Sequence, residues 1–143
     1  MGRGGRMDYS VVDTSVVFKL FLAYGESGLD EAWELMRRHR DRDILLVAPE
    51  LAAIEIASII RHVGVNEPIA LEFLTAYRDL AIELIPATPA RIRAALSTAF
   101  AHQLSIYDAM FLALAQELDC ELVTADLKAF GGIPEEVAKV RLI

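Results

Sequence analysis

Short apolar runs alternate along this chain with longer segments whose apolar residues recur at helical spacing. The clearest run, Ile44–Ala48, has no polar residue, which is typical of a parallel strand buried on both faces. Strands that alternate with helices pair in parallel and are covered by those helices. We therefore expect an α/β fold, a three-layer α/β/α sandwich around a central, mainly parallel sheet.

Local signals give expected bounds for each element. The expected strands are 8–12, 44–48, 82–85, 121–124 and 138–142. The expected helices are 14–23, 27 to the charged cluster 37–42, 49–63, 66–80, 88–102 and 105–118. A short helix or turn should begin at Asp126. Ser27 with Asp30 resembles a capping box and is expected to start the second helix. Pro49 is expected in the first turn of the helix 49–63.

The 143 residues fit one domain, expected over 7–143, with 1–6 as a flexible extension or an artificial leader. No uncharged apolar run approaches the roughly 18 to 20 residues of a membrane span, and no signal-type segment follows the N-terminus. We expect a cytoplasmic protein without a membrane partner. The mean hydropathy of +0.37 exceeds what a soluble monomer needs, so a homodimer or partner interface is expected.

Composition also excludes several kinds of site. The net charge of −7 argues against a protein that holds nucleic acid by a diffuse basic surface. Cys120 is the single cysteine, so neither an intrachain disulfide nor a cysteine zinc site is possible. The histidines His39, His62 and His102 share no ligand spacing, and none is assigned to catalysis.

Four acids lie beside or inside apolar stretches: Asp13 in VVDTSVV, Glu55 in LAAIEIASII, Asp108 in LSIYDAMFLALA and Asp126 in ELVTAD. A charge next to a buried run must be paired, neutralised or bound to a metal. Asp13 follows the first expected strand and Asp126 follows the 121–124 strand by two residues. Sites in parallel sheets form beyond the carboxyl ends of the strands. The sequence therefore predicts one shared site for a hard divalent cation, which in turn indicates phosphate chemistry.

Each acid also has a structural interpretation. Asp13, Asp108 and Asp126 can each act in the capping of a following helix. Glu55 lies in the middle of an expected helix, where its alternative is an ion pair with Arg61 or His62. Glu55 thus points to a functional site more strongly than the other three.

The four motifs, in this order and spacing, resemble the PIN-domain family of metal-dependent ribonucleases, and most closely its VapC-type toxins. The resemblance covers the chain from Met7. It implies that Asp13, Glu55, Asp108 and Asp126 bind Mg²⁺ or Mn²⁺, with Thr14 and Thr124 as polar support. It further implies an endoribonuclease that hydrolyses RNA through a metal-activated water and is neutralised by a cognate antitoxin. Many relatives carry an additional acid shortly after the last motif. Here the segment LKAFGG has none and the next acid is Glu135, so whether the site holds one metal ion or two is left open.

Other functions stay open at this point. The chain is alternatively an inactive PIN-fold binding module, or a PIN nuclease of RNA processing outside a toxin–antitoxin pair. A third class comprises receiver domains and haloacid-dehalogenase-like phosphatases. A receiver usually places its phospho-acceptor Asp after the third strand, where this chain has Pro86. Such a phosphatase has a second Asp two residues after the first, where this chain has Ser15.

Overall fold

The computed structural model describes residues 7–22 and 27–143. Within these residues one sheet contains five strands, all parallel, in the order β3-β2-β1-β4-β5. The strands are β1 (Tyr9–Val12), β2 (Leu45–Pro49), β3 (Glu83–Ile85), β4 (Glu121–Thr124) and β5 (Val140–Leu142). The helices are α1 (Thr14–Leu22), α2 (Leu29–Arg40), α3 (Leu51–His62), α4 (Glu67–Asp79), α5 (Pro89–His102), α6 (Ile106–Leu118) and α7 (Leu127–Phe130).

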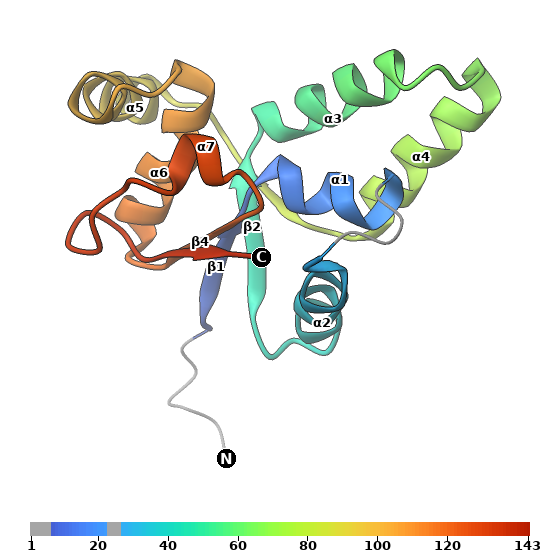
Figure 1. Cartoon of the computed structure of the whole chain (residues 1–143), viewed down its shortest axis with the longest axis horizontal. Coiled ribbons are helices and arrows are strands. Elements are labelled where there is room, and N and C mark those ends of the chain that lie inside the picture. The colour runs from blue at the N-terminus through green and yellow to red at the C-terminus, as the bar shows by residue number, and fades with distance from the viewer. Residues whose placement is uncertain (1–6, 23–26) are drawn as a thin grey trace.

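Alternate residues of the central strands face opposite sides of the sheet. Val11 of β1 packs in the core with Phe111 and Leu112 of α6, whereas the next residue, Val12, packs with Val16 and Leu35 on the other side. Figure 1 shows α5 and α6 on one side of the sheet and α1 and α2 on the other. The period of two therefore makes the strands the middle layer of the expected α/β/α sandwich.

Helix pairs extend these two layers. α3 and α4 lie together beyond α1, and their Ile56, Ile60 and Tyr77 share a core with Val17. On the opposite side α5 packs along α6 through a small core that contains Ala95, Ala109 and Met110. The two pairs flank the end of the sheet where β1 and β4 finish (Figure 1). In the described part of the chain, no helix has both the length and the apolar character needed to cross a membrane.

Most expected elements are present, with shifted ends. Asn66, Thr88 and Ser105 each cap a helix by accepting a backbone N–H, from Ile69, Arg91 and Asp108 respectively. The strand expected from Ala138 begins at Val140, and the strand expected from Ile82 begins at Glu83. The expected extension 1–6 and the helix end at Ala23 lie outside the described residues.

Two predictions of helix starts are wrong. Pro49 ends β2, where it pairs with Ile85 of β3, so sheet pairing prevails over its preference for a first helical turn. Glu50 precedes α3 instead of lying inside it, and its carboxylate accepts the N–H of Ala87 at 2.8 Å. α2 begins at Leu29 after Gly28, which has a φ of 84° and provides no side-chain cap, so Ser27 does not start this helix.

Candidate active site

Asp13 is the buried centre of the candidate site. It follows β1 directly, and its backbone N–H donates to the carbonyl of Val123 on β4 at 2.8 Å. Its side chain is 6% exposed, and Oδ2 accepts hydrogen bonds from Ser15 Oγ at 2.6 Å and Thr124 Oγ1 at 2.8 Å. The pairing of β1 with β4 therefore brings two hydroxyls to one carboxylate oxygen from positions 2 and 111 residues away.

Ser15 and Thr124 connect this carboxylate to the chain that follows β4. Ser15 Oγ accepts the N–H of Ala125 at 2.9 Å, and Thr124 Oγ1 accepts the N–H of Asp126 at 3.0 Å. Thr124 was expected to be polar support for the site, but Ser15 was not among the expected site residues. A hydroxyl two residues after a strand-end acid is the sequence signal that marks it.

Glu55 reaches the site from α3, where it is half-buried. Its Oε1 accepts a hydrogen bond from Thr14 Oγ1 at 2.9 Å. The alternative ion pair with Arg61 or His62 is not formed in the described residues, and His62 Nδ1 instead lies 2.7 Å from the carbonyl of Ser58. Thr14 is therefore the residue that orients the carboxylate of Glu55.

Asp108 and Asp126 both lie at helix starts. Asp108 is in the first turn of α6, and its backbone N–H donates to Ser105 Oγ at 3.1 Å. Asp126 precedes α7, and its Oδ1 accepts the N–H of Ala129 at 3.0 Å. The structural interpretation of Asp126 as a helix cap is therefore confirmed. This cap uses one carboxylate oxygen, and a carboxylate can accept further partners.

The four acids act on one another electrostatically. Burial raises the pKa of the Asp13 carboxyl, an effect to which the charge of Asp126 adds and which the Ser15 and Thr124 hydrogen bonds oppose. Burial also raises the pKa of Glu55, with added contributions from Asp13 and Asp108. The pKa of Asp108 is raised by burial and then by Asp13 and Asp126. No Lys, Arg or His in the described residues forms an ion pair with any of the four.

The donor set fits a hard divalent cation. Carboxylate oxygens are the ligands that Mg²⁺ and Mn²⁺ prefer, and a cation would offset both the burial and the mutual repulsion of these charges. Among residues 7–22 and 27–143, however, no three His, Cys, Asp or Glu side chains already form a group that could hold a metal ion. The carboxylates are thus gathered around one place but would have to be drawn closer together by the ion.

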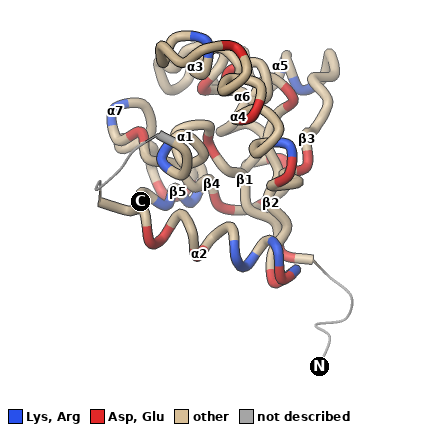
Figure 2. The backbone as a smooth tube through the Cα atoms, turned by 90° about the vertical axis from the view of Figure 1, so that its right-hand side faces the viewer, with Lys and Arg blue, Asp and Glu red and all other residues tan. Residues whose placement is uncertain are grey.

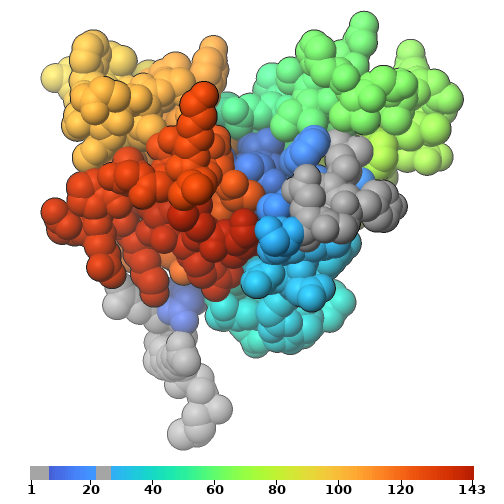
Figure 3. Space-filling view, viewed as in Figure 1, coloured from blue at the N-terminus to red at the C-terminus, as the bar shows by residue number. Residues whose placement is uncertain are grey.

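The space-filling view shows a notch at this place. In Figure 3 it separates the orange part of the chain, which includes α6 and α7, from the green part formed by α3 and α4. Blue residues of the early chain, where α1 begins, form its floor. Each of these three parts carries at least one of the four acids.

Comparisons with known proteins identify the family of this chain. Residues 10–134 match the PIN domain family. The chain is 30% identical over 141 residues to Ribonuclease VapC1 of Mycobacterium tuberculosis, a match that covers 94% of this chain and 100% of that protein.

Solved structures share the fold at lower identity. VapBC2 from Rickettsia felis bound to a DNA fragment from its promoter matches with a TM-score of 0.71 at 11% identity, covering 94% of this chain and 98% of that one. A toxin–antitoxin complex from Klebsiella pneumoniae matches with a TM-score of 0.64 at 21% identity, covering 87% and 92%. The family match, the VapC1 relative and the shared fold together establish that this chain belongs to the PIN domain family, in its VapC branch.

Proposed function

We propose that this protein is a metal-dependent endoribonuclease that acts as the toxin of a toxin–antitoxin pair. The observation that carries the proposal is the convergence of Asp13, Glu55, Asp108 and Asp126, with no cation from the described part of the chain to pair with them. Family membership and the 30% identity to Ribonuclease VapC1 support RNA as the substrate. The intact acid set disfavours an inactive binding module, which has no need for costly charges beside a buried sheet.

The four acids would hold Mg²⁺ or Mn²⁺. Such an ion makes its bound water more acidic and offsets the charge that builds on phosphate oxygens during phosphodiester hydrolysis. Ser15 and Thr124 donate to the Asp13 carboxylate and so favour its ionised form, which is the form that binds a metal. Thr14 holds the Glu55 carboxylate in position across the notch.

Cleavage of RNA by purified, antitoxin-free protein with Mg²⁺ or Mn²⁺ tests this function. Asp13→Asn keeps the shape of the side chain but removes its charge, and should reduce the cleavage rate by more than the roughly 10- to 100-fold typical of residues that only support a ligand. The matched control is Asp79→Asn, which makes the same change at an exposed position at the end of α4. Equal cleavage by wild type and Asp13→Asn would refute the role of Asp13, and no cleavage of any RNA by the wild type would refute the nuclease.

The proposal includes a protein partner, a cognate antitoxin, and a homodimer in the cytoplasm. Several structural neighbours are described as VapBC or toxin–antitoxin complexes. Here α5 exposes Ile92, Leu96 and Phe100 at four-residue intervals, with Phe100 79% exposed. An apolar stripe of this kind suits helix packing. Co-purification with the product of a neighbouring gene tests the antitoxin, and sedimentation at micromolar concentration tests the dimer. Monomeric sedimentation would refute the dimer.

A further inference from the structure

An open hollow lies directly beside two of the four acids. Its volume is about 660 Å³, and Asp108 and Asp126 form part of its wall. The rest comes from the end of α5, the α5–α6 connection, and α7 with the turn after it, including His102, Gln103 and Lys128. This volume falls within the roughly 300–1,000 Å³ of pockets that bind small molecules. A ligand that reaches Asp108 and Asp126 from this side must therefore pass through the hollow.

Lys128 places a positive charge beside Asp108 and Asp126 in the wall of this hollow. It is exposed, lies two residues after Asp126, and forms no ion pair with any residue that the structure describes. Its charge is therefore available to an anionic ligand in a chain whose net charge is −7.

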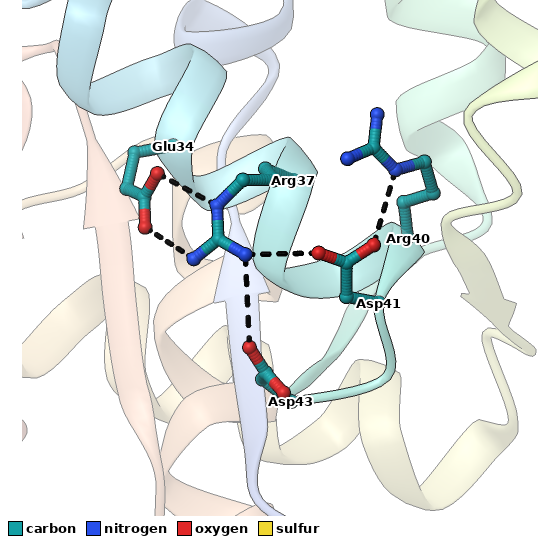
Figure 4. Close-up of polar contacts among 5 residues, drawn as sticks. All are labelled: Glu34, Arg37, Arg40, Asp41 and Asp43. Carbon is teal, nitrogen blue, oxygen red and sulfur yellow. Dashed lines mark hydrogen bonds and ion pairs between the residues drawn. The ribbon is translucent and has the colours of Figure 1, made fainter.

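The arginines at the end of α2 differ in this respect. Arg37 contacts Glu34 at 2.6 Å and Asp41 at 2.9 Å, and Arg40 contacts Asp41 at 3.2 Å (Figure 4). Figure 2 likewise shows basic residues, which are arginines here, and acidic residues along α2. A phosphate at Arg37 or Arg40 would have to compete with carboxylates already in place, whereas a phosphate at Lys128 would not.

The α5–α6 connection supplies neutral polar groups to the same hollow. Gln103 follows the last residue of α5 and caps it with a φ of 54°. Its Nε2 donates to the carbonyl of Phe100 at 3.3 Å, which leaves Oε1 free to accept. Ser105 Oγ accepts the N–H of Asp108 and still has a proton to donate. Hydroxyl, amide and imidazole groups of this kind bind ribose hydroxyls and the exposed edges of unpaired bases.

We propose that this hollow binds one or more nucleotides of single-stranded RNA beside the phosphate that is cleaved, with Lys128 on a phosphate and His102 and Gln103 on a base or ribose. The proposal rests on the proposed ribonuclease function and adds the direction of the substrate. The RNA strand runs from the four acids toward α5 and α7, and side chains on this side of the notch determine which RNA sequence is bound.

Binding of a fluorescein-labelled single-stranded RNA in Mn²⁺, followed by anisotropy at several salt concentrations, tests the proposal. Glu55→Gln serves as the parent protein. It removes the charge of one proposed metal-binding acid on α3 and so prevents cleavage during the measurement, and it leaves the hollow unchanged. Lys128→Met in this parent should weaken binding about tenfold, as expected for one charge-assisted contact. It should also reduce the slope of log K against log salt by about 0.7, the value for one phosphate on a single strand.

The matched control is Lys139→Met, which removes an exposed lysine that precedes β5 and does not line this hollow. A second pair of variants uses Gly132, which lines the hollow and where an added Cβ meets no atom within 4 Å. Gly132→Glu should weaken RNA binding by repelling phosphate, whereas Gly132→Ala should leave it unchanged.

Two negative results are distinguishable. If wild type cleaves RNA but Lys128→Met and Gly132→Glu bind RNA as their controls do, the hollow is not the nucleotide site and the ribonuclease function stands. If the parent binds no RNA and wild type cleaves none, both proposals are overturned.

Discussion

Replacing Thr124 with Val tests how the site is held together. Thr124 ends β4 and is fully buried, with an exposed fraction of 0%. Its hydroxyl donates to Asp13 Oδ2 at 2.8 Å and accepts the backbone N–H of Asp126 at 3.0 Å. Val has nearly the same shape, so the substitution removes both hydrogen bonds without opening a cavity.

The expected cost follows from these two contacts. Loss of a hydrogen bond to a charged group costs about 1.5–3 kcal/mol, and a buried N–H left without a partner costs about 1–3 kcal/mol. The two losses are not additive, because Asp13 keeps its bond from Ser15. We therefore expect the free energy of unfolding to fall by about 2 kcal/mol, and the melting temperature of a domain of this size to fall by roughly 6 °C.

The same substitution should change metal binding. The Thr124 hydrogen bond lowers the pKa of Asp13 against the effect of burial, so its loss raises that pKa further. At a given pH, a smaller fraction of the Asp13 carboxylate is then ionised. We expect Thr124→Val to bind Mn²⁺ more weakly than wild type at pH 6, with a smaller difference at pH 8.

Urea unfolding measures the first effect and calorimetric titration with Mn²⁺ the second. Thr75→Val, at an exposed position of α4, is the matched control and should leave both quantities unchanged, because Thr and Val have similar helix propensity. A loss of stability below about 0.5 kcal/mol, the usual range for surface substitutions, would refute the assigned hydrogen bonds. Equal Mn²⁺ affinity at both pH values would refute their role in ionising Asp13.

Three further predictions concern the same region. Because burial raises the folded-state pKa of Asp13 above its ordinary value of 3.8, the stability that this group contributes is present below that value and lost as pH rises through the folded-state pKa. In urea unfolding without metal, the free energy of unfolding of Asp13→Asn should therefore exceed that of wild type at pH 8, and the difference should shrink toward pH 4. A difference that does not change with pH would contradict this prediction. Thr14→Val removes the 2.9 Å bond to Glu55 and should lower RNA cleavage by about 10- to 100-fold while the chain stays folded by circular dichroism, and unchanged cleavage would argue against the orienting role. The buried hydroxyl of Tyr77 has no hydrogen-bond partner among residues 7–22 and 27–143, and burial, with the nearby charge of Glu55, raises the pKa of Tyr77 to about 12. Tyr77→Phe should thus keep or increase the free energy of unfolding, by up to about 1 kcal/mol, and a clear loss in urea unfolding would reveal a partner for this hydroxyl.

Much of the fold could be predicted from local sequence, because its signals act over a few residues. Asn66, Thr88 and Ser105 each cap a helix as their positions indicate. The errors arise where a distant partner decides. Pro49 has a local preference for a helix start, but its pairing with Ile85 keeps it in the sheet.

The candidate site could be predicted in part for the same reason. Asp13 and Asp126 follow strands, and parallel strands finish at one edge, so their placement at the same edge of the sheet follows from the order of elements. The role of Ser15 could not be inferred this way. Its hydroxyl meets Thr124 and Ala125 only because β1 and β4 are neighbours, although more than a hundred residues separate them along the chain.

The sequence by itself determined the alternation of strands and helices, and the identity of the acids that lie beside apolar runs. Both are local properties, set by side-chain period and by the cost of burying charge. Only the tertiary structure decided the strand order, which brings Thr124 to Asp13, and the packing of α3 near α1, which brings Thr14 to Glu55. These contacts depend on which surfaces bury one another best across the whole chain, and no single segment encodes that choice.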